Sequence, residues 1–307
     1  MRLSLAAFAF CSLALPTTAH AFCRTTTQAL PPNYSPSRGC YTEGLLLFWR
    51  NACVSYSINE AASRSIPFDD AKRVIDESFA TWANVTCPDG NPVGIAVSNI
   101  GSAECAEVKY NQETANQNLI VFRDDGWPYN DPYSTLGLTT VTFNAETGEI
   151  YDADMEINSS ARNLSTSDKV PANGFDLASV VTHEAGHFFG LAHATSPSAT
   201  MYASYKPGSS ALRTLSQDDI AGICSIYPNT SIRTVSPEVS VTETVQADAC
   251  DPNPRHGFTS ACSVPKSDEK CACATPRPTV SWGASASMAV VVGGVLFARR
   301  RRAARRH

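Results

Sequence analysis

Alternating apolar and polar positions divide the middle of the chain into strand and helix candidates. Val54–Ile58 alternates as a half-buried strand does, and Phe68–Trp82 repeats its apolar residues at helical spacing, with acidic residues in the first turn. Short apolar runs predict four further strands, over 95–97, 118–122, 138–143 and 150–157. Two more helices are predicted over 176–191 and 215–227, the second with a capping box of Ser216 and Asp219.

The two ends of the chain carry apolar segments of another kind. Residues 1–21 combine one positive charge, an apolar run and small residues near position 21, which is typical of a secretory signal peptide. Residues 279–298 are twenty uncharged residues followed by the basic residues 299–307. This predicts a transmembrane or sorting helix with a basic cytoplasmic tail. We therefore expect a protein that is secreted, displayed at the cell surface or anchored in the envelope.

Cysteines and composition describe the regions between the ends. Residues 22–44 are rich in Pro, Ser and Thr and are expected to form an irregular N-terminal arm, and 229–278 a cysteine-containing stalk or linker. Apart from Cys11, the cysteines fall into an even front group and an even rear group, so disulfides are expected inside each group. The front group is Cys23, Cys40, Cys53, Cys87, Cys105 and Cys224, and the rear group is Cys250, Cys262, Cys271 and Cys273. A zinc ribbon in the rear group is the alternative, but its spacing lacks opposed C-x-x-C pairs.

Composition and charge exclude several classes of protein. The chain has 307 residues, of which 43% are hydrophobic and 17% charged, unlike a wholly disordered protein, a coiled coil or a polytopic membrane protein. Seven of the 24 basic residues lie in the two ends, so residues 22–298 carry 17 basic residues against 29 acidic ones. A nucleic-acid partner is not expected, because binding a phosphate backbone requires clustered Lys and Arg.

One short segment contains a candidate metal site. His183 and His187 are four residues apart, so on a helix they share one face and can bind the same ion. Glu184 follows the first histidine, where its carboxylate can act on a water molecule. Gly190 can take the left-handed backbone that ends a helix sharply, so that the chain returns with His193. Three neutral imidazoles leave a fourth tetrahedral position open, which is typical of catalytic zinc sites.

This pattern resembles the metzincin metallopeptidases and, within them, the matrixin family. The motif runs His183-Glu-Ala-Gly-His-Phe-Phe-Gly-Leu-Ala-His193. Met201, within Ala199–Tyr202, matches the methionine of the family's Met-turn, and Tyr205 matches the tyrosine that follows it. Two unrelated histidines on an amphipathic helix would not account for the glycine and the third histidine at these offsets.

The resemblance covers residues 45–228 and implies a metzincin catalytic domain over that range. The implied fold is α/β (α+β zincin-like), a twisted mixed five-stranded sheet with two main helices, a Met-turn and a small C-terminal subdomain. The implied activity is that of a zinc endopeptidase with one catalytic Zn²⁺, in which Glu184 takes the proton of the attacking water. A polypeptide substrate would pair with the edge strand near Leu138–Val141, and the enzyme would act as a monomer.

The sequence also departs from the family. The Pro-Arg-Cys-Gly-x-Pro segment that silences matrixin zinc is missing, and residues 22–44 are too short for the family's prodomain. Between residues 22 and 298 the chain has three motif histidines and His256, so a second histidine-bound zinc is not expected. Ala203 stands where matrixins often have proline, in the wall of the S1′ pocket.

A strand of alternating acidic residues is a candidate calcium site. Asp152, Asp154 and Glu156 alternate with apolar residues, so they share one face of the predicted strand. Calcium prefers hard oxygen ligands, and matrixins bind calcium through an acidic stretch in this region. The alternative is the solvated face of an outer strand.

The C-terminal residues 271–307 resemble a MYXO-CTERM sorting tail, with Cys271-Ala-Cys273 ahead of the apolar run and the arginines. The resemblance implies a bacterial surface protein whose tail is removed during sorting. Two other functions compete with an anchored peptidase. A surface adhesin that uses zinc only for stability does not need Glu184 or an open coordination position, and a zincin whose third ligand is a distant glutamate does not need His193 or Met201.

Overall fold

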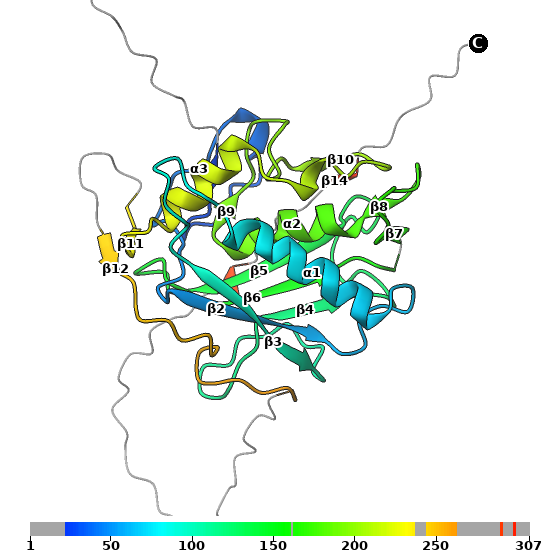
Figure 1. The fold of residues 1–307 in the computed structure, drawn as a ribbon, viewed down its shortest axis with the longest axis horizontal. Helices are drawn as coiled ribbons and strands as arrows, with labels where there is room; N and C mark the ends of the chain where they lie inside the picture. The colour runs from blue at the N-terminus through cyan, green and yellow to red at the C-terminus, as the bar shows by residue number, and fades with distance from the viewer. Residues whose placement is uncertain (1–21, 161, 237–243, 263–288, 291–296, 299–307) are drawn as a thin grey trace, which may run out of the picture.

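Five main strands, joined at one edge by the two-residue strand β13 (Ala289–Val290), form one twisted mixed sheet, as the resemblance to the metzincins implies (Figure 1). The computed structural model describes residues 22–160, 162–236, 244–262, 289–290 and 297–298. The signal-peptide and basic-tail predictions lie outside these residues. The strands are β2 (Cys53–Asn59), β3 (Ala96–Ala103), β4 (Leu119–Phe122), β5 (Gly137–Phe143) and β6 (Ile150–Ile157). Each strand overlaps a segment whose apolar pattern predicts one, although β3 continues well beyond 97.

Among the five main strands, β5 lies at an edge and β6 in the interior. The order is β3-β2-β4-β6-β5, in which β5 is antiparallel to β6 and the other pairs are parallel. Met155 of β6 pairs with Ile120 on one side and with Thr139 on the other. The alternative of a solvated outer strand over 150–157 is therefore wrong. Along the outer side of β5, the backbone of β13 (Ala289–Val290) pairs antiparallel with Val141 and Thr142.

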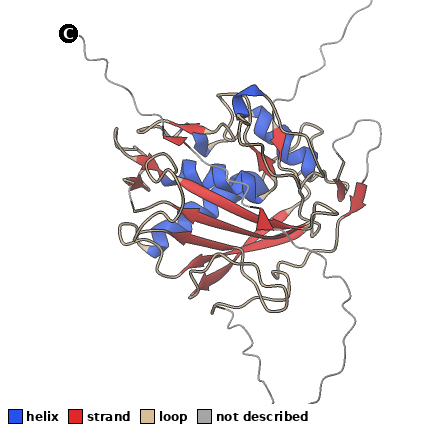
Figure 2. Ribbon diagram, turned by 180° about the vertical axis from the view of Figure 1, so that it is seen from behind, coloured by secondary structure: helices blue, strands red, loops and turns tan. Residues whose placement is uncertain are grey.

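Helices α1 (Phe68–Ala83) and α2 (Leu177–Phe188) cover one face of the sheet, and they lie behind it in Figure 2. The buried residues of α1 are Ala71, Val74, Ile75, Ser78, Phe79 and Trp82, which are the residues that its periodicity predicts. The Phe79 ring stacks on Tyr56 of β2, with ring centroids 4.1 Å apart. Burying a large apolar side chain contributes about 1.5–3 kcal/mol, so this face fixes the helices firmly on the sheet.

The third helix and the end of α2 show where local signals hold and where they fail. Helix α3 (Gln217–Ile226) begins with the predicted capping box, in which Ser216 and Asp219 exchange hydrogen bonds with each other's backbone. Helix α2 is shorter than the predicted 176–191, because it ends at Phe188. Gly190 then adopts a φ of 95°, which turns the chain back toward the sheet.

Short strand pairs hold the loops around this core. They are β1 (Cys23–Arg24) with β9 (Leu191–Ala192), β7 (Leu164–Ser165) with β8 (Phe175–Asp176), β10 (Ser204–Tyr205) with β14 (Phe297–Ala298), and β11 (Ile232–Thr234) with β12 (Thr244–Gln246). In the part of the chain that the structure describes, no helix has both the length and the apolar character needed to cross a bilayer. Most of the predicted helix 279–298 lies outside that part.

Four disulfides connect distant parts of the chain. They are Cys23–Cys40, Cys53–Cys250, Cys87–Cys224 and Cys105–Cys262. The expectation of separate front and rear groups is wrong, since two bonds join one group to the other. Pairing depends on which cysteines the fold brings together, and an even count in each group does not determine it. These two bonds tie residues 244–262 to β2 and to the end of β3.

Candidate metal centre

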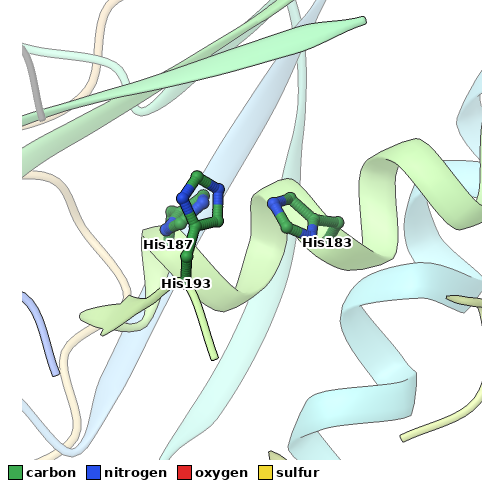
Figure 3. Close-up of side chains that lie close together, drawn as sticks. All are labelled: His183, His187 and His193. Carbon is green, nitrogen blue, oxygen red and sulfur yellow. The ribbon is translucent and has the colours of Figure 1, made fainter. Parts of the chain in front are cut away.

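Three histidine side chains converge beside the end of α2. Figure 3 shows His183 and His187 on the helix with their rings toward His193, which comes from the segment after β9. The ring centroids lie 4.9–5.2 Å apart, and one nitrogen of each ring lies within 4.8 Å of the other two. All three residues are buried. The structure thus brings together the three residues that the motif predicts as ligands.

The chemistry of this cluster fits a metal ion. The Nε2 atoms of all three histidines are buried without a hydrogen-bond partner. Burial lowers the pKa of His183 to about 3 and of His187 to about 4, and it also lowers the pKa of His193. Neutral imidazoles with free, convergent nitrogens are the form in which histidine binds zinc. Leaving such nitrogens unpartnered in a protein interior would otherwise cost free energy.

Backbone carbonyls orient two of the rings. His183 Nδ1 lies 2.7 Å from the carbonyl oxygen of Thr200, and His187 Nδ1 lies 2.8 Å from that of Leu191. A hydrogen bond at Nδ1 assigns the proton to that nitrogen and leaves Nε2 free as a ligand. The ring positions are therefore set by the turn after α2 and by the Met-turn.

Asp219 secures the Met-turn, although its position in the sequence predicts only a helix-capping role. Its Oδ2 accepts a hydrogen bond from Thr200 N at 2.8 Å, and its Oδ1 accepts one from Met201 N at 3.1 Å. Met201 is 2% exposed, and its sulfur packs against Gly186 of α2, where a larger residue would leave it no room. The predicted methionine thus packs beneath the histidine helix. The first turn of α3 is linked through Thr200 to the His183 ring.

Glu184 is fully buried at the edge strand. Its Oε2 accepts a hydrogen bond from Thr139 Oγ1 at 2.8 Å, while its Oε1 has no hydrogen-bond partner. A Cβ on Gly137 would lie 2.8 Å from the Glu184 side chain, so β5 approaches closely because this residue is glycine. Burial raises the pKa of Glu184 to about 8. Thr139 and Gly137 were not identified from the sequence, since they are about 45 residues from Glu184 and match no motif.

Tyr205 connects the segment after the Met-turn to the start of α2. Its hydroxyl accepts a hydrogen bond from Asp176 N at 2.9 Å and donates one to the Ser209 carbonyl. Asp176 caps α2 through Ser179 N and forms an ion pair with Arg213 at 2.6 Å. Burial raises the pKa of Tyr205 to about 12, so the hydroxyl keeps its proton.

Aromatic side chains from other elements hold α2 by its carbonyl oxygens. Trp82 Nε1 donates to the Thr182 carbonyl and Trp49 Nε1 donates to the Phe188 carbonyl, both at 2.8 Å. Tyr227 donates to the carbonyl of Phe189 at 2.8 Å. The sequence gives no signal for these contacts beyond the presence of large aromatic residues, because the partners lie far apart in the chain.

The three acidic residues of β6 do not gather into one cluster of free ligands. Glu156 is paired with Arg123 at 2.6 Å and accepts a hydrogen bond from Tyr129. Asp154 accepts one from Leu119 N at 2.8 Å, and the buried Asp152 Oδ1 has no partner. Burial raises the pKa of Asp152, and it raises that of Asp154 to about 7.

A second group of candidate ligand atoms is already used in a covalent bond. Among the described residues, Cys105, Glu107 and Cys262 also lie close enough together to hold an ion, but the two cysteines form a disulfide. The histidine cluster is therefore the stronger metal site.

Comparison with known proteins identifies relatives of this region. The family model of peptidase M10, matrixin, matches residues 48–228. The chain is 27% identical over 187 residues to metalloendoproteinase 1-MMP of Arabidopsis thaliana, covering 60% of this chain and 46% of that protein. It is 27% identical over 181 residues to human matrilysin, covering 58% of each, and 31% identical over 159 residues to metalloendoproteinase 1 of Glycine max, covering 52% of this chain and 46% of that protein. The chain thus spans about half the length of these relatives.

Proposed function

The chain belongs to the matrixin family of zinc metalloendopeptidases, and from this premise we propose that the protein is an exported endopeptidase that uses Glu184 as its general base. His183, His187 and His193 would hold one zinc ion. When bound, zinc supplies a Lewis acid that polarises the scissile carbonyl and lowers the pKa of water. The single observation that carries the proposal is the set of three buried, unpartnered Nε2 atoms, together with a buried, unpartnered oxygen on Glu184, the residue that follows His183.

Glu184 is suited to moving a proton. Its free Oε1 can accept the proton of the attacking water, and the hydrogen bond from Thr139 holds the other oxygen in place. A buried carboxylate with one oxygen held and the other free can take a proton from water and return it to the departing amine. A structural zinc site in an adhesin would not require a buried carboxylate with a free oxygen beside the ligands.

The edge of the sheet supports a polypeptide substrate. β5 is the edge strand next to Glu184, and the backbone of Ala289–Val290 already pairs antiparallel along it. An extended peptide can add to such an edge through main-chain hydrogen bonds, and side-chain pockets then provide specificity. A peptide would enter in the same orientation, with its carboxyl end toward Gly137.

Export and attachment complete the proposal. The four disulfides agree with an oxidising compartment, which supports a secreted or cell-surface protein. Attachment to a bacterial envelope through 279–298, and calcium at the acidic strand, rest on the sequence. For calcium, Asp152 and Asp154 are better candidates than Glu156, whose oxygens contact Arg123 and Tyr129.

The test is cleavage of a peptide library by the full-length exported protein, with chelator and with zinc added back. We expect cleavage to stop with chelator, return with zinc, and fall about 10²–10⁴-fold in Glu184→Gln. Zinc content and thermal unfolding of the variant should match those of the wild type. Undiminished cleavage by zinc-loaded Glu184→Gln would overturn the assignment of the base, and a wild type inactive on all peptides would overturn the endopeptidase.

A further inference from the structure

The N-terminal arm reaches the metal centre, although its irregular sequence predicts no such contact. β1 pairs antiparallel with β9, with Cys23 opposite Ala192 and Arg24 opposite Leu191. The arm therefore lies along the segment that joins the second histidine to the third. The Cys23–Cys40 disulfide closes residues 23–40 into a loop, here named the arm loop.

Thr25 fixes the arm loop relative to the histidine ligands. Its backbone nitrogen donates to the Gly190 carbonyl at 2.9 Å, and its hydroxyl donates to the Leu191 carbonyl at 3.0 Å. The same Leu191 carbonyl lies 2.8 Å from His187 Nδ1. The loop and the ligand thus share one anchoring oxygen, so the loop is held in a constant position beside the metal site.

A hollow lies between the arm loop and two of the histidines. Its lining includes Leu30, Tyr34 and the nearby Tyr41 together with His187 and His193. Leu30 is 42% exposed, and the rings of Tyr34 and Tyr41 meet edge to face with centroids 6.0 Å apart. The hollow itself is small, about 30 Å³, so its exposed leucine and two aromatic rings provide an apolar surface for a ligand side chain to lie against, and not a deep pocket.

The arginine that lines the hollow is occupied elsewhere. The Arg24 guanidinium donates to the carbonyls of Leu47 and Thr234, at 2.9 and 3.1 Å, and burial lowers its pKa to about 10. Arg24 is therefore engaged with the protein's own backbone. The other side chains that the described part of the arm contributes to the lining are uncharged, so the hollow favours an apolar group over a charged one.

The hollow lies toward one end of the edge strand. Thr26 of the arm pairs with Leu46, and the neighbouring Phe48 pairs with Glu149 in the turn after β5. Glu184 faces the other end of β5, at Gly137 and Thr139. A peptide antiparallel to β5 begins near Phe143, so the residues before its cleaved bond lie on the side of the arm loop.

We propose that the arm loop forms a substrate subsite, which takes an apolar side chain of the polypeptide on the amino-terminal side of the cleaved bond. The inference rests on the proposed endopeptidase function and adds a specificity site to it. The subsite's arm residues lie outside the region that the matrixin family model matches, which begins at residue 48. It is a property of this chain's own N-terminal segment.

The experiment is a cleavage profile of the full-length protein on a peptide library that varies each position around the cleaved bond. Leu30→Asp introduces a negative charge into the hollow, and Ile232→Asp introduces the same charge at a similarly exposed apolar residue on β11, 38% exposed. We expect Leu30→Asp to lower the preference for Leu or Phe over Lys by about tenfold or more at one position before the cleaved bond. Ile232→Asp should keep the wild-type profile.

Two further measurements make the outcome decisive. Zinc content and thermal unfolding of each variant report its folding, and Leu30→Ser provides a milder change that should weaken the same preference without favouring Lys. Profiles of Leu30→Asp and Leu30→Ser that match the wild type at every position would overturn the subsite. If the wild type cleaves no peptide, the proposed function fails; if it cleaves selectively and the Leu30 variants do the same, only the subsite fails.

Discussion

The histidine cluster and the acidic strand are both buried polar groups, but they use their polar atoms differently. Each histidine leaves Nε2 unpartnered, and backbone carbonyls hold the Nδ1 atoms of His183 and His187. On β6, Glu156 accepts from Arg123 and Tyr129, Asp154 accepts from Leu119 N, and Asp152 Oδ1 is the one oxygen of the three carboxyls that is buried without a partner. A metal site is therefore recognised by several ligand atoms that converge and have no hydrogen-bond partner in the protein. A group of acidic residues is not sufficient evidence for one.

The largest expected difference between the two regions is in zinc affinity. His193→Ala removes one of three convergent nitrogens, so zinc affinity should fall by more than the roughly 10–100-fold expected for losing an outer hydrogen-bond partner. Glu156→Gln should leave zinc affinity unchanged. Competition with a chromophoric chelator measures both variants. Equal zinc affinities in the two variants would contradict the comparison.

In contrast to zinc affinity, the stability of the fold is expected to depend on the acidic strand. Glu156 is fully buried beside Arg123, whose side chain is 24% exposed. Glu156→Ala removes the ion partner of a partly exposed guanidinium that keeps only its hydrogen bond to the Ala106 carbonyl, which costs up to about 3 kcal/mol of unfolding free energy. Denaturant unfolding of the zinc-free protein measures this loss, with Glu77→Ala, which removes an exposed pair with Arg73, as the control. A loss no larger than that of the control, which should be below about 1 kcal/mol, would show that the pair is not needed.

The most gradual expected effect is a dependence of the unfolding free energy on pH, which we attribute to the buried carboxyls of Asp152 and Asp154. Burial raises the pKa of both carboxyls, to about 7 for Asp154. The folded protein therefore holds protons that the unfolded chain releases near pH ~4. The stabilisation that the two protonated carboxyls contribute is fully present below that pH. It is lost as the pH rises toward 7, by up to about 1.4 kcal/mol per pH unit for each proton.

Unfolding free energies at a series of pH values test this dependence. Asp152→Asn should flatten the decline between about pH 4 and 7, because one of the two buried carboxyls no longer ionises. Calcium gives the comparison a sharper form: if it binds at this pair, added calcium should stabilise the protein increasingly as pH rises. If the unfolding free energy falls equally with rising pH in the wild type and in Asp152→Asn, the two carboxyls are not the cause of the decline.

Local patterns predicted most of the fold and the central residues of the site. Periodicity identified the buried face of α1, and the capping box identified the start of α3. The histidine motif determined its own geometry, because spacing on one helix and one glycine turn brings the three rings together. In each case the information lies within a few neighbouring residues.

Other features could not be predicted, because they depend on contacts between distant residues. Thr139 meets Glu184 only once β5 lies at the sheet edge. β6 has an alternating sequence that would suit an outer strand, yet β4 and β5 enclose it. The disulfides depend on spatial proximity, so even counts of cysteine in two regions gave the wrong pairing.

The bonds Cys53–Cys250 and Cys105–Cys262 close the C-terminal segment into a covalent ring with the sheet. A single proteolytic cut anywhere between Cys224 and Cys250 leaves both pieces joined, so nicking there does not detach the metal centre from the chain after Cys250. A pull on the chain beyond Cys262 is transmitted to Cys105, just after the end of β3, and bypasses α3 and the Met-turn. If the chain is attached to a surface through residues 279–298, as we propose, its release under oxidising conditions requires a cut after residue 262, and a reductant is required to separate a chain cut before that point.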